Sequence, residues 1–129
     1  MNELRICTMN CRGLGDYRKR RDVFHYLRRS NFNIYLLQDI HCQKKMENIF
    51  RNAWGTDILI APFKSNARGV AILTKGIQVK VCECRIDDEG NFIVAKVTLN
   101  DTIPVLLVNI YGPNDDSPDF YENIGNRRD

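Results

Sequence analysis

The feature that most constrains the fold is a strand, a helix and a second strand in close succession near the N-terminus. Residues Leu4–Met9 mostly alternate apolar and polar side chains, which predicts a strand. Asp16, a residue type that caps helices, precedes a helical pattern over residues 17–30. Ile34–Leu37 is a continuous apolar run, typical of a strand buried on both faces. The chain therefore opens with a unit of βαβ type, although a sandwich of mixed sheets also accommodates it.

The remainder of the chain is predicted to be mainly strands. Residues 43–53 favour a short helix with Met46, Ile49 and Phe50 facing inward. After it, apolar segments are separated by turn residues, and the expected strands are Asp57–Ala61, Gly69–Thr74, Ile77–Val81, Phe92–Leu99 and Ile103–Tyr111. The sequence thus predicts an α/β fold with a mixed sheet, two early helices and at least four strands in two layers.

Length and composition indicate one folded domain. The chain has 129 residues, of which 43% are hydrophobic and 27% charged, and this excludes wholesale disorder. Its net charge of +3 is unevenly distributed, because residues 1–51 carry +6 and residues 52–129 carry −3. A basic N-terminal third fits an anionic partner, and a solvated helix face explains it nearly as well. The apolar stripe of the first helix is Val23, Phe24 and Leu27, and its other positions are filled by Arg18, Lys19, Arg20, Arg21, Arg28 and Arg29.

The cysteines and the N-terminus favour an intracellular protein, nuclear or cytoplasmic, that is neither secreted nor in a membrane. No long apolar segment with a cleavage site follows Met1, and no run approaches the ~18–20 apolar residues of a membrane span. Cys82 and Cys84 form the only close pair and lack the second pair that a zinc site needs. Free structural thiols are therefore favoured over metal ligands for Cys7, Cys11, Cys42, Cys82 and Cys84.

Polar side chains stand where three of the expected strands end. Asn10 closes the first, Gln38–His41 closes the second, and Asn109–Asn114 closes the last. A carboxylate at one strand end, with amide and phenol groups at the others, can hold a hard cation and a phosphate. Mg²⁺ takes oxygen ligands and usually only one or two carboxylates. The alternative is that each residue caps a strand or satisfies loop backbone.

Four segments, in this order, resemble motifs of the endonuclease/exonuclease/phosphatase superfamily. Arg5–Leu14 is similar to its first strand, which ends in Asn-x-x-Gly, and Leu36–His41 to its Leu-Gln-Glu-x-His motif. Arg68–Leu73 is similar to a Gly-Val-Ala-Ile-Leu strand, and Val108–Asn114 to an Asn-x-Tyr-x-Pro-Asn segment. In detail the chain most resembles the N-terminal half of the apurinic-endonuclease-like domain of non-LTR retrotransposons.

The resemblance implies the N-terminal half of a four-layer α/β/β/α sandwich that hydrolyses phosphodiesters with Mg²⁺ or Mn²⁺. It places a metal ligand at Asp39 and a residue that helps to hold metal and phosphate at Asn10. Tyr111 matches the tyrosine of the phosphate site, so Asn10, Asp39 and Tyr111 are the implied catalytic residues. We expect these three side chains to face one polar cleft at one edge of the strands.

The resemblance also implies that the substrate is DNA, held through its phosphate backbone. Asn114 matches the position near the scissile strand, and His41 a position beside the metal ligand. Arg12, with the arginines of the first helix, would face the anionic backbone, which supplies the sequence-independent part of nucleic-acid affinity. Asn114, Arg12 and His41 are therefore the implied substrate-binding residues.

Two departures from the family pattern bear on activity. Asp39 stands where the family has Glu, so the carboxylate reaches roughly 1.5 Å less far, the length of about one methylene. In addition, residues 1–129 correspond to a partial domain that lacks the Asp-x-Asn and Ser-Asp-His motifs. We therefore expect no nuclease activity from the chain alone. The alternatives are half of a nuclease that needs its other half, a non-enzymatic remnant that binds nucleic acid weakly, and an unrelated interaction module.

In the family, the inner face of the sheet formed by this half packs on the sheet formed by the other half, so without the other half an apolar sheet face would be exposed to solvent. Alternation puts Ile93, Ala95, Val97 and Leu99 on one face of the expected strand over residues 92–99. We expect that face to be exposed and to drive self-association or pairing with the missing half.

Overall fold

The computed structural model describes residues 3–55 and 58–112. They form seven strands, two α-helices and one 3₁₀ turn, and the α/β class is confirmed. In chain order the elements are β1 (Ile6–Asn10), α1 (Tyr17–Arg29), β2 (Ile34–Gln38), η1 (Lys44–Met46), α2 (Glu47–Trp54), β3 (Ile58–Ala61), β4 (Val70–Thr74), β5 (Val79–Ile86), β6 (Phe92–Leu99) and β7 (Ile103–Ile110).

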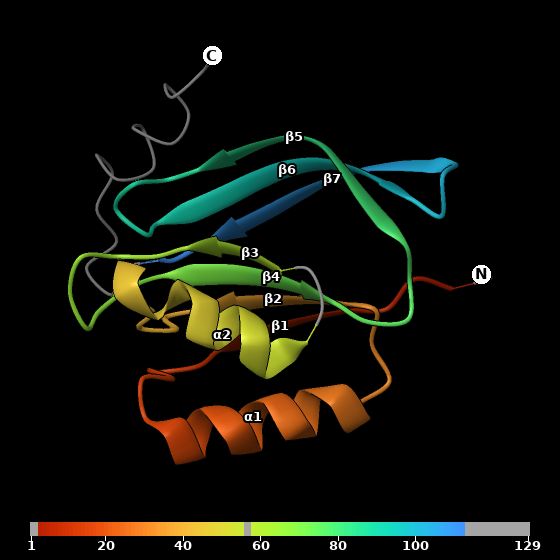
Figure 1. Cartoon of the computed structure of the whole chain (residues 1–129). Coiled ribbons are helices and arrows are strands. Elements are labelled where there is room, and N and C mark those ends of the chain that lie inside the picture. Colours follow the sequence, from red (N-terminus) through yellow and green to blue (C-terminus); the bar gives the residue numbers. More distant parts are fainter. Residues whose placement is uncertain (1–2, 56–57, 113–129) are drawn as a thin grey trace.

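Two sheets and a helical layer make up the described part of the chain. One sheet has the strand order β1-β2-β4-β3, with β1 parallel to β2 and the other pairs antiparallel. The other is the antiparallel meander β5-β6-β7. Both helices cover one face of the four-stranded sheet and the meander covers its other face (Figure 1). The arrangement therefore has three layers where the sequence predicted two.

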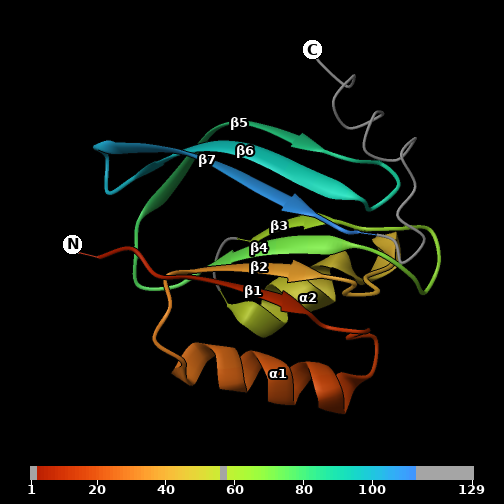
Figure 2. The ribbon, with the colours of Figure 1, turned by 180° about the vertical axis from the view of Figure 1, so that it is seen from behind.

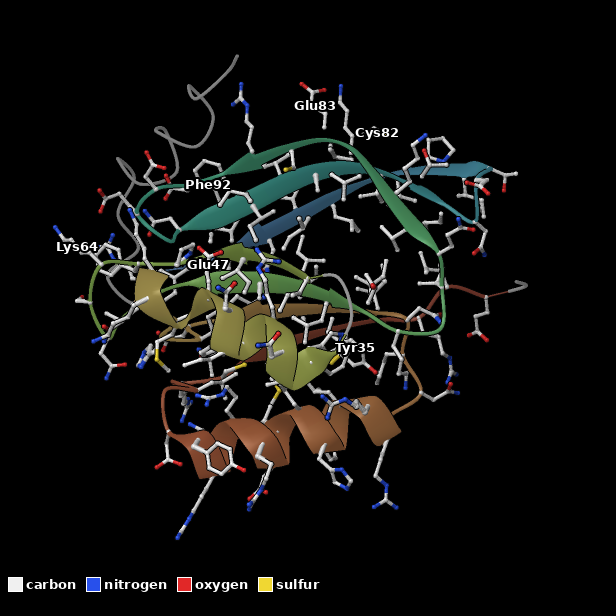
Figure 3. The ribbon with its side chains drawn as sticks, viewed as in Figure 1. Tyr35, Glu47, Lys64, Cys82, Glu83 and Phe92 are labelled. Atoms are coloured by element: carbon white, nitrogen blue, oxygen red, sulfur yellow. The ribbon has the colours of Figure 1, made fainter. Side chains whose placement is uncertain are left out.

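Strand β2 shows why the four-stranded sheet is packed against other elements on both of its faces. Its side chains alternate between two apolar cores, with Tyr35 and Leu37 in the core under the helices and Ile34 in the core between the sheets. Figure 3 shows Tyr35 between the sheet and the helices, where its hydroxyl donates to the Leu27 carbonyl oxygen at 2.5 Å. The prediction of a strand buried on both faces is confirmed.

Helix α1 begins and packs largely as its sequence predicts. The Asp16 carboxylate accepts hydrogen bonds from the backbone N–H groups of Arg18 and Lys19, which caps the helix. Arg20 is the exception, because it is buried and not part of the solvated basic face. Its guanidinium donates to the carbonyl oxygens of Leu14 and Gly15 and lies 5.1 Å from the ring centre of Phe50. Carbonyl groups and a π face replace the water that this cation loses.

The buried face of helix α2 differs from the face that the sequence predicted to point inward. Phe50 is buried as expected and Trp54 joins it, whereas Ile49 is 45% exposed, so its inward assignment is wrong. Phe24 of α1 contacts both buried rings edge to face, and these contacts set the rotation of α2 on the sheet. Neither described helix is long and apolar enough to cross a membrane.

The expectation of an uncovered apolar face on β6 is wrong. Ile93, Ala95, Val97 and Leu99 are all buried, in one core with residues of the four-stranded sheet such as Ile72. The reason is that this chain supplies both sheets, so the meander turns its apolar face onto β2 and β4. The two stacked sheets and the edge strands β1 and β7 can be followed from behind in Figure 2.

One buried amide joins the two sheets through hydrogen bonds. Asn109 of β7 is 1% exposed, and its Nδ2 donates to the carbonyl oxygens of Leu37, at 3.0 Å, and Ala71, at 2.8 Å. Its Oδ1 accepts a hydrogen bond of 2.7 Å from Nε2 of Gln38. Asn109 therefore fixes the position of β7 above β2 and β4 at the end of the sheets where β1 and β2 terminate.

All five cysteines are free thiols: Cys11 and Cys42 are buried, Cys7 is half-buried, and Cys82 and Cys84 are exposed. Burial raises the pKa of Cys11 to about 12 and that of Cys42 to about 12. Cys82 and Cys84 are exposed on β5, which extends beyond the predicted Ile77–Val81 to Ile86 and bulges between Val81 and Glu83. Figure 3 shows Cys82 and Glu83 at the outer surface of the meander.

Replacing Asn109 should destabilise the fold strongly. We expect Asn109→Ala to lower the free energy of unfolding by about 2–3 kcal/mol, because two buried carbonyl groups lose a donor. The matched control Asn52→Ala, at an exposed position of α2, should change it by less than about 0.5 kcal/mol. Urea unfolding followed by circular dichroism measures both, and equal effects would contradict the assigned role.

The two thiol classes should differ in reactivity. The reactive species is the thiolate, so at pH 8 an aromatic disulfide reagent should label Cys82 and Cys84 rapidly and leave Cys11 and Cys42 unmodified. A Cys82→Ser/Cys84→Ser double variant should lose the rapid phase, and all thiols should react in denaturant. Rapid labelling of Cys11 in the folded protein would be inconsistent with this core.

Candidate functional site

The ends of β1 and β2 form a continuous rim at one edge of the four-stranded sheet. Asn10 and Gln38 are register partners in the parallel pair, and Asp39 follows directly. Backbone pairing continues past the strands, with the N–H of Gly13 donating to the Asp39 carbonyl oxygen at 2.7 Å. The Asn10 side-chain oxygen accepts from the N–H of Arg12 at 3.1 Å, which turns the chain sharply after β1. The sheet thus brings Asn10, at the end of β1, close to the loops that carry Arg12 and Asp39.

Asp39 and His41 form a hydrogen-bonded pair on this rim. His41 Nε2 lies 2.8 Å from Asp39 Oδ1, and the two side chains are 24% and 21% exposed. The imidazole lies against Gly13, where an added Cβ would come within 2.6 Å of Nδ1. A glycine at position 13 is thus what allows the ring to reach the carboxylate, and it links the Asn-x-x-Gly segment to the His41 side chain.

The rim concentrates backbone strain. Arg12, Asp39, His41 and Arg68 all have φ between +50° and +56°, a left-handed conformation that side chains rarely adopt. Their loops are tied together, since the N–H of His41 donates to the Arg68 carbonyl oxygen at 2.8 Å. Strained non-glycine residues of this kind cost about 1–3 kcal/mol each and gather at functional sites. This clustering singles out the rim as the candidate site.

The last strand reaches the same end of the molecule through Asn109, whose side chain bonds to Gln38. Tyr111 follows, half-buried against the core between the sheets, and its N–H donates to the Asn91 carbonyl oxygen at 2.7 Å. Among the described residues no hydrogen bond joins the Tyr111 phenol to Asn10 or Asp39. Asn114, the remaining implied site residue, lies outside the described residues.

The sequence alone assigned no specific role to Gln38 and Asn109. The structure shows that these amides connect the two sheets just below the rim, so they position it. The signal was present, because an amide within an apolar strand must find partners when it is buried. Arg68 was also missed, and it lies over the Phe63 ring at 4.8 Å, with Nη1 3.5 Å from Asn91 Oδ1.

The rim offers few oxygen atoms to a hard cation. No three His, Cys, Asp or Glu side chains cluster into a metal site within residues 3–55 and 58–112. Asp39 supplies one carboxylate, and Asn10 supplies an amide oxygen that already accepts one N–H. Mg²⁺ accepts such a sparse set when water and substrate phosphate complete its shell.

No protein-family model matches the sequence. Among solved structures, the chain is similar to the AP endonuclease LMAP from Leishmania major, with a TM-score of 0.66 and 15% identity. The match covers 93% of this chain and 43% of that chain, so the present chain spans less than half of that protein's length. The fold of this chain is similar to that of part of this endonuclease. This confirms the fold expected from the motif resemblance, and the site assignments remain predictions.

Substitution of Gly13 tests the rim directly. Gly13→Ala and Gly55→Ala both place a side chain at a left-handed φ, so each should cost about 1–2 kcal/mol of stability. Only Gly13→Ala should also displace the His41 ring, because nothing lies within 4 Å of a Cβ at Gly55. Imidazole ¹H–¹⁵N signals report this displacement, and unchanged His41 signals in Gly13→Ala would contradict the described packing.

Proposed function

We propose that this chain is part of a metal-dependent phosphodiester hydrolase acting on DNA, and that it provides one side of the active site. The single observation that carries the proposal is the strained rim at the ends of β1 and β2, where Asn10 ends β1 and Asp39 directly follows β2. The nuclease-like fold supports it, since the described parts of the four motif segments lie on or directly beside β1, β2, β4 and β7.

In this proposal Asp39 and Asn10 hold Mg²⁺ or Mn²⁺. The ion, when bound, polarises the phosphoryl group and stabilises the charge that develops on its oxygens. His41 keeps the Asp39 carboxylate in place through the 2.8 Å hydrogen bond, as side chains behind metal ligands commonly do. Tyr111 would bind the phosphate from β7, the other sheet, and Asn114 would contact the strand to be cut.

The finer assignment is an apurinic-endonuclease-like domain of a non-LTR retrotransposon, with residues 1–129 forming its N-terminal part. The Asn-Cys-Arg-Gly-Leu and Asn-Ile-Tyr-Gly-Pro-Asn segments support this assignment. Activity would then require groups supplied by further polypeptide, because a water nucleophile needs a positioned base worth about 10²–10⁴-fold in rate.

A second candidate function is nucleic-acid binding without hydrolysis. The sparse ligand set favours it, because Asp39 is the one carboxylate on the described rim and is shorter than the family's Glu. Cation binding distinguishes the two candidates, since a binding module has no need of an ion at Asp39.

Mn²⁺ binding tests the proposed metal site. We expect Mn²⁺ to broaden the amide signals of residues 10–13 and 38–41 first, because a paramagnetic ion at Asp39 lies nearest to them. Asp39→Ala should abolish this local broadening, whereas Asp39→Glu, which restores the family's longer carboxylate, should retain or strengthen it. Broadening that is unchanged in Asp39→Ala would refute the site.

Hydrolysis should be undetectable with this chain alone. We expect supercoiled plasmid incubated with the protein and Mg²⁺ to be nicked no faster than in buffer, because the sequence contains neither the Asp-x-Asn nor the Ser-Asp-His motif that would activate the attacking water. The Asp39→Ala variant serves as the control for contaminating nucleases. Nicking by the parent protein that disappears in this variant would show that the chain is a complete enzyme.

A further inference from the structure

The turn between β5 and β6, residues 87–91, contacts the loops of the rim from the other sheet. Figure 1 shows this turn beside the β3–β4 loop, at the end of the sheets where β2 terminates. Gly90 is buried in the turn, and its carbonyl oxygen accepts a hydrogen bond of 3.0 Å from the N–H of Gly69. The meander is thereby bonded to the residue that directly precedes β4.

Gly69 connects this turn to the loop that carries Asp39. The Gly69 carbonyl oxygen accepts the N–H of Ile40 at 3.1 Å, and the neighbouring carbonyl oxygen of Arg68 accepts the N–H of His41 at 2.8 Å. Asp39 stands between the end of β2 and these two bonds. Its backbone is therefore held by β2 on one side and by the segment at Gly69 on the other.

The same turn also holds the backbone of Tyr111. The carbonyl oxygen of Asn91, the residue after Gly90, accepts the Tyr111 N–H at 2.7 Å. Successive residues of one turn thus bond to the end of β7 and to the segment that fixes the Asp39 loop. Asn109 joins the sheets within the core, whereas this turn joins them at the rim itself.

Internal hydrogen bonds and close packing give the turn one shape. Asp87 is 2% exposed, its carboxylate accepts the Asn91 N–H at 3.0 Å, and its carbonyl oxygen accepts the Gly90 N–H at 3.2 Å. Gly90 has a φ of +69°, and a Cβ there would lie 3.1 Å from the Gly69 nitrogen and 3.2 Å from the Pro62 carbonyl oxygen. Both are backbone atoms, which do not move aside as the end of a flexible side chain does. The close approach of the two segments therefore requires glycine at position 90.

We propose that the β5–β6 turn positions the two sides of the active site, by setting the distance between Tyr111 and the metal ligand Asp39. Asp87 and Gly90 are its positioning residues, because they act through the backbone of the turn and of Gly69. Holding the groups that bind ion and phosphate at a fixed separation lowers the entropy cost of binding both together. The roles of Asp39 and Tyr111 rest on the proposed function, whereas the backbone connection between them does not.

Gly90→Ala tests the close approach, and Gly76→Ala is its matched control. The φ angles of the two glycines are +69° and +67°, so a side chain strains both backbones nearly equally. A Cβ at Gly76, however, would have Asn33 Nδ2 as its nearest described neighbour, at 3.9 Å. Without metal, Gly90→Ala should shift the amide ¹H–¹⁵N signals of both His41 and Tyr111, and Gly76→Ala should leave them in place.

Mn²⁺ then measures the positioning itself. At saturating Mn²⁺, the broadening of the Tyr111 amide signal relative to that of Ile40 reports how far Tyr111 lies from the ion. We expect Gly90→Ala to change this ratio and to weaken Mn²⁺ binding several-fold, and Gly76→Ala to change neither. A loss of stability alone would not alter the ratio in the folded protein.

Asp87→Ala is a second test that leaves the glycine packing intact. It removes the side-chain acceptor of the Asn91 N–H, so it should also weaken Mn²⁺ binding and change the broadening ratio. Asp87→Asn, whose amide oxygen can still accept that N–H, should restore both. Asp88→Ala, at an exposed position of the same turn, should behave as the parent protein does.

The results separate the positioning role from the proposed function. Parent-like Mn²⁺ affinity and parent-like Tyr111 broadening in folded Gly90→Ala and Asp87→Ala would overturn the positioning role. Shifts of the His41 and Tyr111 amides in metal-free Gly90→Ala, with no Mn²⁺ bound at Asp39 in the parent protein, would refute the proposed hydrolase and leave the connection between turn and rim standing.

Discussion

The double-sided burial of β2 and β4 is the constraint on which the rest of this structure depends. Both strands carry apolar side chains on each face, so one face needs the helices and the other needs a second sheet. The meander β5–β7 meets that need within the same chain. Within β2 and β4 the polar side chains, Gln38 and Thr74, are therefore confined to strand ends. Asn109 of β7 enters the core between the sheets because it satisfies two strand carbonyl groups.

The candidate site follows from this confinement. β1 and β2 are parallel, so both leave the sheet at the same edge and their first loop residues become neighbours. The loops turn back sharply through left-handed residues, and the core below them is too rigid to relax that strain. A carboxylate, an amide, an imidazole and several cations therefore gather over a small area. Preorganised charges and dipoles of this kind can stabilise the negative charge that develops on a phosphate during hydrolysis.

Local signals in the sequence predicted most elements but not their long-range packing. The Asp16 cap, the continuous apolar run of β2 and the helical stripe containing Phe24 each depend on neighbouring residues, and the structure confirms them. The burial of Ile49 and of the inner face of β6 was predicted wrongly, because burial at these positions depends on contacts with residues distant in the sequence. Arg20 was misassigned because a charge is expected in water unless carbonyl groups and an aromatic ring replace it.

The central claim is that Asp39 and Asn10 form a cation site within a phosphate-binding surface. Anomalous diffraction from crystals soaked with Mn²⁺ and a short oligonucleotide tests it most directly. We expect an anomalous peak at the Asp39 carboxylate, with one phosphate beside the ion. Ordered crystals with nucleotide bound but no anomalous density at Asp39, or with manganese only at other residues, would contradict it.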